Sequence, residues 1–385
     1  MKTFKTTWLH PILIATALAL ASCGGSGGGS DDDKDASNPS MRSVGKQIFF
    51  DEDLSSNDNQ SCGSCHDPAA GFADPSVTTM DPVSEGSVPG QFGNRNAPTA
   101  AYAAFIPVFG SSTKTTVDGT DSNFEGGQFL DGRRDTLAEQ AKDPFLNPVE
   151  MNMTKTAVVT AVKNSSYAKE FKEVFGANAF DDENQAYDNI ADAIAAFESS
   201  SEVNPFSSKF DAVMAGNASF SASEQRGFDL FKGTEAKCGN CHTVDNPAAG
   251  SLFTDFNYYN IATPVNTDNP AYIANNAFRD GGLGDSPVIT SPAEQAAEQG
   301  KFRTPTLRNI EMTAPYMHNG AYETLEDVIR HYDVTASVSF PAYVPEVDND
   351  IAIELNYRTD ITLGLSMQDY DDLEAFMLTL TDGYF

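Results

Sequence analysis

Cys62-Gly63-Ser64-Cys65-His66 and, much later in the chain, Cys238-Gly239-Asn240-Cys241-His242 share the pattern C-x-x-C-H, which is typical of c-type haem attachment. Two thiols must reach the two vinyl groups on one edge of a porphyrin, and the adjacent histidine then coordinates the iron. A four-cysteine zinc site or two disulfides are the alternatives, but neither explains why a histidine follows each pair. We therefore predict two covalent c-type haems, one held by each motif.

Helical patterns flank both motifs. Val44, Ile48 and Phe49 precede the first motif, and Ser221 with Glu224 forms a capping box ahead of the second. Each half also closes with an amphipathic pattern, made by Ile190, Ile194 and Phe197 in the first and, after Ser366 and Asp369, by Leu373, Phe376, Met377 and Leu380 in the second. Strand signals are weak. The predicted fold is mostly α with long loops, in two cytochrome c-like domains over 41–205 and 206–385.

Composition places the chain among ordinary globular proteins. Its 385 residues are 40% hydrophobic and 21% charged, which argues against disorder, collagen-like repeats and a polytopic membrane protein. The formal charge of −31 repels phosphate backbones, so we expect no nucleic-acid partner. Such a surface instead favours the approach of basic partners.

Residues 1–22 have the anatomy of a secretory signal peptide, with a basic start and an apolar run too short for a permanent membrane span. Leu20-Ala21-Ser22-Cys23 resembles the bacterial lipobox, in which the cysteine is lipidated; plain signal cleavage is the alternative. Residues 23–40, rich in Gly, Ser and Asp, are expected to form a disordered tether. We expect an exported protein of a Gram-negative bacterium, periplasmic or anchored to the outer membrane by lipid alone.

Several further stretches, in the same order, resemble the bacterial dihaem cytochrome c peroxidase family, which includes MauG. They are Ser43–His66, Arg95–Thr99, Phe129–Met151, Phe302–Asn309 and Pro315–Gly320. The resemblance extends from about Ser43 to Leu380. It implies that the N-terminal haem is peroxidatic and that the C-terminal haem receives electrons and passes them on. Two haems suit a reaction that consumes two electrons.

The resemblance also implies roles for single residues. Glu150, in N-P-V-E-M, matches the family's catalytic glutamate, which moves a proton between the two peroxide oxygens, and Gln140 matches its distal glutamine. A solvated Glu150 and a helix-capping Gln140 are the alternatives. Asn96, Thr313 and Pro315 match ligands of a calcium ion, although Asn-Ala-Pro-Thr is also a good turn without metal.

Three further side chains are candidates for contacts with the haem propionates. Arg303 and Arg308 are expected to pair with these carboxylates. For His318, a hydrogen bond to a propionate and simple packing within its loop are both open.

The chain departs from the family at the distal side of the N-terminal haem. No histidine lies between His66 and His242, and the position of the family's distal histidine falls near Val88. We therefore expect a haem that is open in the oxidised enzyme. A distant histidine, His318 or His331, swinging into the site is the alternative.

A second departure concerns the path between the haems. Leu130 stands where the family usually has tryptophan, and the sole tryptophan, Trp8, lies in the predicted leader. Electron transfer would then use tyrosine or direct tunnelling. Just ahead, the polar insertion 110–127 is expected over a haem edge or in an interface loop.

The sixth ligand of the C-terminal haem is the third departure. The peroxidases place a methionine on the helix after P-Y-M-H-N-G, whereas MauG-like proteins place a tyrosine. Here Thr324 is a natural N-cap, and helical phase puts Tyr332 on the same stripe as Leu325, Val328 and Ile329. We predict Tyr332 as the ligand, which would lower the potential of this haem. A packing tyrosine, a histidine, and Met312 or Met317 are the alternatives.

These features predict an enzyme, a dihaem peroxidase that reduces hydrogen peroxide with electrons from a small periplasmic donor such as a cytochrome c or a cupredoxin. The alternatives are a MauG-like oxidase acting on a protein or organic substrate, and a non-enzymatic electron-transfer lipoprotein. A homodimer is suggested by the family alone.

Overall fold

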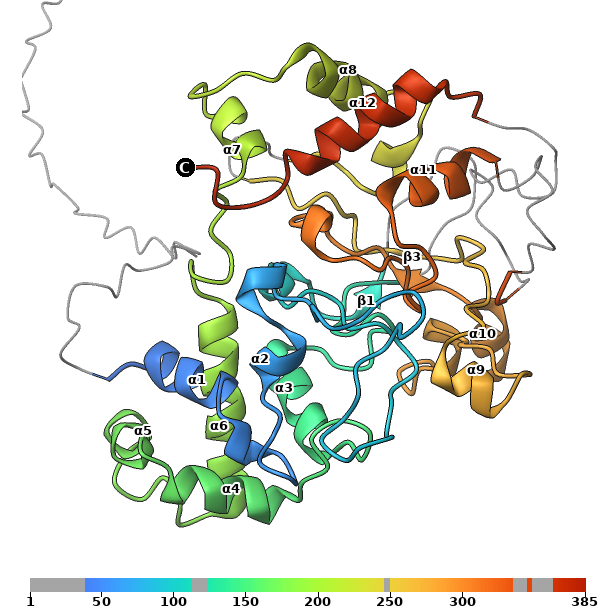
Figure 1. The fold of residues 1–385 in the computed structure, drawn as a ribbon. Helices are drawn as coiled ribbons and strands as arrows, with labels where there is room; N and C mark the ends of the chain where they lie inside the picture. The colour runs from blue at the N-terminus through green and yellow to red at the C-terminus, as the bar shows by residue number, and fades with distance from the viewer. Residues whose placement is uncertain (1–38, 113–123, 246–249, 335–344, 348–362) are drawn as a thin grey trace, which may run out of the picture. The chain divides into compact units, whose positions relative to one another are not determined.

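The computed structural model describes residues 39–112, 124–245, 250–334, 345–347 and 363–385. The described part is mostly helical with long loops, as predicted, and its only sheets are two antiparallel pairs of two-residue strands (Figure 1). The predicted leader, and the tether up to residue 38, lie outside these residues. Ser40, which we assigned to the tether, instead caps the first helix. No helix in the described ranges is long and apolar enough to cross a membrane.

The first group of helices surrounds one apolar cluster that extends from Val44 to Val203. Its members are α1 (Met41–Phe49), α2 (Cys62–Cys65), α3 (Leu137–Leu146), α4 (Lys155–Asn164), α5 (Ala168–Phe175) and α6 (Glu183–Glu198). The predicted stripes form this core, because the side chains of Val44, Ile48, Ile190 and Ile194 are at most 1% exposed.

A close crossing between α1 and α6 closes the first group. A Cβ atom at Gly45 would lie 1.8 Å from the carbonyl oxygen of Ala193, so only glycine allows the two backbones to approach this closely. Near this crossing, the rings of Phe49 and Phe197 pack edge to face with centroids 5.1 Å apart.

The second group surrounds a separate apolar cluster that extends from Phe210 to Leu380. Its helices are α7 (Lys209–Met214), α8 (Ala222–Lys232), α11 (Leu325–Val334) and α12 (Met367–Leu378) (Figure 1). Two short helices, α9 (Pro270–Ala274) and α10 (Pro292–Ala297), lie in the long connection between α8 and α11. The predicted capping boxes at Ser221 and Ser366 are both present.

The second group repeats the crossing seen in the first. A Cβ atom at Gly227 of α8 would lie 1.8 Å from the carbonyl oxygen of Asp372 in α12. Each haem-attachment motif therefore follows a helix that crosses the closing helix of its own group at a glycine.

The predicted insertion begins and ends in a short hairpin, β1 (Gly110–Ser111) with β2 (Phe124–Glu125). Its base is fixed to the C-terminal half near β3 (Tyr258–Tyr259), which pairs with β4 (Phe302–Arg303). The Tyr258 hydroxyl donates to the carbonyl oxygen of Gly126 at 2.5 Å. The backbone N–H of Gly126 in turn donates to the carbonyl oxygen of Phe256. The ends of the insertion thus lie at a contact between the two halves; residues 113–123 lie outside the described part.

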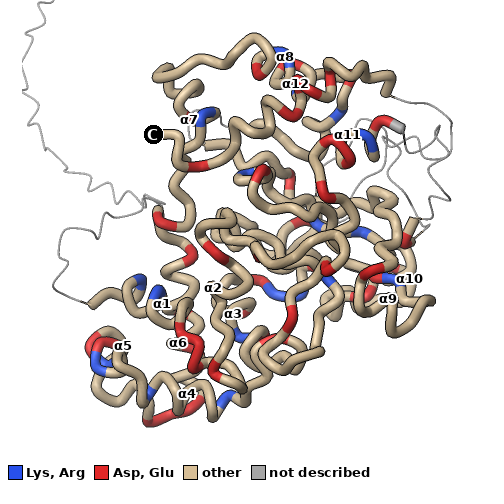
Figure 2. The backbone as a smooth tube through the Cα atoms, viewed as in Figure 1, with Lys and Arg blue, Asp and Glu red and all other residues tan. Residues whose placement is uncertain are grey.

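Acidic residues are distributed over both groups of helices (Figure 2). Arginines hold two of the buried carboxylates, those of Asp131 and Asp280. Arg95 pairs with Asp280 at 2.7 Å and with Asp131 at 2.6 Å, and Arg133 also binds Asp131. Because Asp280 belongs to the C-terminal half, Arg95 ties the two halves together.

Candidate functional site

The first C-x-x-C-H motif forms the short helix α2 and the turn after it. Ser61 and Ser64 make a capping box at its start, and the backbone N–H of His66 donates to the carbonyl oxygen of Cys62 at 2.9 Å. The imidazole Nδ1 of His66 lies 3.1 Å from the carbonyl oxygen of Phe72. This contact selects Nδ1 as the protonated nitrogen and gives Nε2 the lone pair that a metal requires.

The second motif has the same local geometry on the 3-10 turn η5 (Cys238–Asn240). The backbone N–H of His242 donates to the carbonyl oxygen of Cys238 at 2.9 Å, and Nδ1 of His242 lies 2.8 Å from the carbonyl oxygen of Phe253. Both histidines are thus oriented by a main-chain carbonyl from the loop that follows the motif.

The chemistry of both motifs fits a covalently attached haem. All four motif cysteines are free thiols, and burial raises the pKa of Cys65 and of Cys238 to about 12. Burial also lowers the pKa of His66, which keeps the imidazole neutral as an iron ligand must be. Among the residues that the structure describes, no three His, Cys, Asp or Glu side chains are grouped to hold a metal ion, so the zinc alternative has no site.

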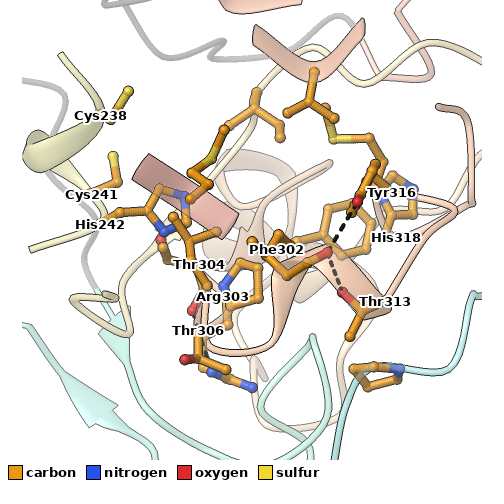
Figure 3. Close-up of a pocket in the computed structure, with 18 of the residues that line it drawn as sticks. Cys238, Cys241, His242, Phe302, Arg303, Thr304, Thr306, Thr313, Tyr316 and His318 are labelled. Carbon is orange, nitrogen blue, oxygen red and sulfur yellow. Dashed lines mark hydrogen bonds between the residues drawn. The ribbon is translucent and has the colours of Figure 1, made fainter. Parts of the chain in front are cut away.

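A cavity of about 300 Å³ extends from the second motif toward the N-terminal half. Cys238, Cys241 and His242 lie on one side of it, and Tyr316 and His318 lie on the opposite side (Figure 3). Its wall is mostly apolar and includes Leu130 of the N-terminal half. An apolar cavity that meets both thiols and the imidazole of one motif is the environment that a porphyrin requires.

Tyr332 lies in the wall of this cavity together with Val328 and Ile329 of α11, so helical phase placed it correctly. Burial, together with the nearby thiols of Cys241 and Cys238, raises the pKa of Tyr332. The phenol is therefore next to the second motif. Met317 also lines the cavity and keeps the methionine alternative open, whereas Met312 does not line it.

His318 and His331, the two histidines considered as alternative ligands, already have partners. His331 places Nδ1 3.0 Å from the Tyr322 hydroxyl and Nε2 2.7 Å from the carbonyl oxygen of Ile261, and burial lowers its pKa to about 4. Nε2 of His318 lies 2.9 Å from Glu346, and its ring stacks on Phe302 with centroids 3.7 Å apart. These contacts disfavour a histidine as sixth ligand; His318 contacts Glu346 and Phe302, and it also lines the cavity.

Arg303 and Arg308, which we grouped together, have different roles. Arg303 lines the cavity, is 6% exposed, and donates to carbonyl oxygens, including that of Phe129 at 3.1 Å. Burial lowers the pKa of Arg303, so an anion in the cavity would stabilise its charge. Arg308 requires a correction. Its guanidinium is fully buried and binds both carboxylate oxygens of Asp211 at 2.6 and 2.8 Å, so it is a structural cation rather than a propionate partner.

The three residues that the sequence predicts as calcium ligands, Asn96, Thr313 and Pro315, all line the same cavity, although they belong to segments far apart in the sequence. The side-chain amide nitrogen of Asn96 donates to the carbonyl oxygen of Pro82 at 3.1 Å. This hydrogen bond leaves the amide oxygen as the atom of Asn96 that can bind a cation. Oxygen atoms from an amide and two backbone carbonyls suit a hard cation.

Glu150 lies in the turn after α3 and close to the first motif. Burial raises its pKa, whereas hydrogen bonding from Asn147 and the charge of Arg133 act against that rise. The Asn147 amide donates to Oε1 of Glu150 at 2.7 Å. The carboxylate also contributes to the raised pKa of the Cys62 and Cys65 thiols, behind their burial, which places it within electrostatic range of both. Glu150 is therefore not a solvated surface residue.

The other distal candidates lie around this turn. Gln140 is half-buried on α3, and Thr136, not Gln140, caps that helix. The backbone N–H of Ser87, the residue before Val88, donates to the carbonyl oxygen of Glu150 at 2.7 Å. The segment where the family would place its distal histidine thus packs directly against the Glu150 turn.

One acidic residue near the first motif was not singled out from the sequence. Glu198, at the end of α6, is 6% exposed and lies close enough to Cys62 to raise the pKa of its thiol, second only to burial. The signal was present, because Glu198 follows Ile190 and Ile194 at four-residue steps on the buried face of α6.

Comparison with known proteins agrees with this geometry. The family model for di-haem cytochrome c peroxidase matches residues 39–219. The chain is 36% identical to the methylamine utilization protein MauG of Paracoccus denitrificans over 89% of this chain and 88% of that protein. It is 33% identical to the cytochrome c551 peroxidase of Nitrosomonas europaea over 76% of this chain and 72% of that protein. The crystal structure of the diheme peroxidase BthA from Burkholderia thailandensis superimposes with a TM-score of 0.77 at 32% identity, covering 89% of this chain and 86% of that one.

Proposed function

The chain belongs to the di-haem cytochrome c peroxidase family, and from this premise we propose that it reduces hydrogen peroxide to water with electrons from a small periplasmic redox protein. Haem enzymes of this kind are oxidoreductases, and two c-type haems are implied by the family. We further propose that residues 41–205 and 206–385 are two cytochrome c-like domains. The separate apolar clusters and the repeated glycine crossing support that division.

The residues of the first motif would hold the peroxidatic haem. Cys62 and Cys65 would bond to its vinyl groups, and His66, oriented by the carbonyl oxygen of Phe72, would coordinate the iron. A bound haem supplies the redox chemistry that breaks the O–O bond. The residues of the protein must move the proton between the peroxide oxygens. They must also keep other bases from taking up that proton.

Glu150 carries the proposal, because it is a buried carboxyl beside the first motif. The Asn147 amide occupies Oε1, so Oε2 is the oxygen that carries the proton from one peroxide oxygen to the other. Burial raises the pKa of Glu150, which makes the carboxyl a better proton donor at neutral pH than an exposed glutamate. The side chain is held in place by the turn against Ser87.

Glu150→Gln tests this role. The variant keeps the shape of the side chain and the hydrogen bond from Asn147, but it lacks the titratable carboxyl proton. Peroxide turnover should therefore fall by about 10²- to 10⁴-fold. Haem content, measured as the pyridine haemochrome, should stay at two per chain. Glu173→Gln, at an exposed ion pair on α5, is the matched control and should retain full activity. Full turnover in Glu150→Gln would remove Glu150 from the mechanism.

The second motif would hold the electron-transfer haem, with His242 and Tyr332 on the iron. Tyr332 in the cavity wall beside Cys238 and Cys241 supports this assignment. Arg303 would offset the charge of a propionate. A calcium ion held by Asn96, Thr313 and Pro315 remains part of the proposal on the ground that all three line one cavity.

A second function is favoured by the same tyrosine. A tyrosine beside the second motif, together with 36% identity to MauG, supports a MauG-like oxidase that acts on a protein or organic substrate. Turnover with a reduced cytochrome c or cupredoxin separates the two functions, since a peroxidase should consume the donor rapidly and an oxidase only slowly. A non-enzymatic electron carrier would show neither reaction, and the buried Glu150 argues against it. The lipid anchor at Cys23, the periplasmic or outer-membrane location and a homodimer stay predictions.

A further inference from the structure

Glu198 is a buried carboxyl for which neither the fold nor the proposed mechanism has a use. It is the last residue of α6 and is 6% exposed, and its Oε2 atom has no hydrogen-bond partner among the described residues. A carboxylate at this place is costly, because the last turn of a helix carries partial negative charge and burial removes solvation. A buried carboxyl at such a cost is a candidate for a role that uses its charge or its proton.

The position of Glu198 is specific to the first motif. Its charge raises the pKa of the Cys62 thiol, whereas the Cys238 thiol responds only to burial and to its own backbone. Two other buried polar atoms near this end of α6 or this motif also lack partners among the described residues, Oγ of Ser200 and Oε1 of Gln60. The Gln60 amide lies 3.8 Å from Sγ of Cys65. Three of the unsatisfied polar atoms of the described part thus lie near the place where the first haem would be attached.

Most of the cations on the helices packed against α6 are engaged elsewhere, and Lys163 of α4 is exposed to solvent. Arg42 and Lys46 of α1 pair with Glu202, and Lys142 of α3 pairs with Asp188. On α4, Lys155 binds Asn184, and the short helix η4 (Ala103–Phe105) carries no titratable side chain. Burial is accordingly the sole cause of the raised pKa of Glu198, which is about 8.

Two other carboxyl groups face the first motif, and both have donors. Glu150 accepts from Asn147. Asp74, which raises the pKa of Cys65, accepts from the hydroxyls of Ser76 and Ser84 at 2.6 Å. Hydroxyl and amide donors thus reach the carboxylate oxygens of Asp74 and Glu150, whereas Oε2 of Glu198 has no donor among the described residues.

We propose that Glu198 is the proton-loading residue of the N-terminal haem site: it binds one proton from solvent when the site gains one electron and releases that proton when the site is oxidised. The inference rests on the proposed haem attachment at Cys62 and Cys65. The electron comes from the reduced redox protein of the proposed function or from an electrode, and the proton neutralises the added negative charge. Glu198 acts as a positioning residue for charge and does not touch the iron.

The sign of the effect follows from electrostatics. An electron added beside Glu198 makes its proton harder to remove, so the carboxyl has a lower pKa in the oxidised state than in the reduced state. Between these two values reduction takes up a proton, and the reduction potential of the N-terminal haem falls as pH rises. Above the higher value and below the lower one, Glu198 contributes no slope.

Spectroelectrochemical titration of the holoprotein from about pH 4 to about pH 9 tests the proposal, since this range brackets the ordinary and the raised carboxyl values. In Glu198→Gln the pH-dependent fall of the N-terminal potential should be lost, and the C-terminal potential should keep its own pH profile. Glu202→Gln, four residues further along and paired with Lys46, is the matched control and should behave as the parent. A slope that persists in Glu198→Gln, or that disappears in Glu150→Gln instead, would overturn the inference.

Two further measurements keep the outcome decisive. Redox-difference infrared spectra of the unmodified protein should show a protonated carboxyl band that appears on reduction and shifts in D₂O; its absence overturns the proposal even where Glu198→Gln does not fold. The pyridine haemochrome and peroxide turnover report separately on the proposed function. If Glu198→Gln holds two haems, turns over peroxide fully and keeps the pH-dependent slope of the N-terminal potential, the role of Glu198 alone is refuted. If the unmodified protein lacks haem, the proposed function is refuted.

Discussion

Asp211→Asn is expected to destabilise the C-terminal half by about 3–5 kcal/mol, because it leaves the charge of Arg308 buried without its counterion. The Arg308 side chain is 0% exposed and that of Asp211 is 10% exposed, so water replaces little of the lost interaction. The carboxylate accepts two charge-assisted hydrogen bonds from Arg308, each worth about 1.5–3 kcal/mol. It also accepts from the backbone N–H of Ser208 in the capping box of α7, and a lost cap adds about 1 kcal/mol. An asparagine retains one acceptor, which keeps the expected cost below the sum of these contributions.

The loss should also reach the second haem site. Nε of Arg308 donates to the carbonyl oxygen of Ser251 at 2.7 Å, two residues before Phe253, whose own carbonyl orients His242. Urea unfolding followed by circular dichroism gives the stability change, and the haem absorbance of the folded variant reports on His242. Glu173→Gln, at an exposed ion pair, should change stability by less than about 0.5 kcal/mol.

The pH dependence of this effect has a defined sign. Burial alone would raise the pKa of Asp211, but hydrogen bonds and charge from Arg308 hold it below its ordinary value of 3.8. A lowered carboxyl pKa contributes stability above that ordinary value and loses it as pH falls through the folded-state pKa. The gap between parent and variant should therefore narrow below about pH 4. A cost below about 1 kcal/mol at neutral pH would refute the view that Arg308 depends on Asp211.

Three further predictions concern the axial ligand, the helix crossings and the cation. Tyr332→Phe should change the electron paramagnetic resonance signal of the C-terminal haem, and Tyr332→Met should raise its potential; an unaltered signal in the Phe variant would exclude tyrosine ligation. Gly227→Ala should lower the midpoint of thermal unfolding by several degrees, because its Cβ would lie 1.8 Å from a backbone oxygen, whereas Gly93→Ala, with nothing within 4 Å, should not. Extensive dialysis against a calcium chelator should remove about one calcium per chain, measured by elemental analysis, and Asn96→Ala should reduce its retention; a protein prepared with calcium that retains none would contradict the site.

Sequence periodicity located four helices that bury one face, α1, α6, α8 and α12, and it turned Tyr332 toward the cavity. Capping patterns located the starts of α8 and α12 but not that of α1. These features depend on local spacing, which the sequence displays directly.

The same reasoning failed for long-range pairing of charges. Arg308 was expected beside a propionate, but its carboxylate partner comes from α7, about a hundred residues earlier in the chain. No local pattern identifies which of the many acids of this chain will be buried next to a given arginine. Glu198 is a different case, because its spacing from Ile190 and Ile194 puts it on the buried face of α6, although a single acid at a helix end usually faces solvent.

In the proposed haem sites, the carbonyl contacts of His66 and His242 limit what side-chain substitution can do to the two irons. The acceptors are main-chain atoms of Phe72 and Phe253, so changing either side chain leaves the oxygen in place. The electron-donating strength of both proximal imidazoles thus depends on the backbone conformation of the loops, and substitution of the Phe72 or Phe253 side chain does not remove the acceptor. Engineering of the two redox centres must then work from the opposite face, or through backbone chemistry such as an ester at the peptide group.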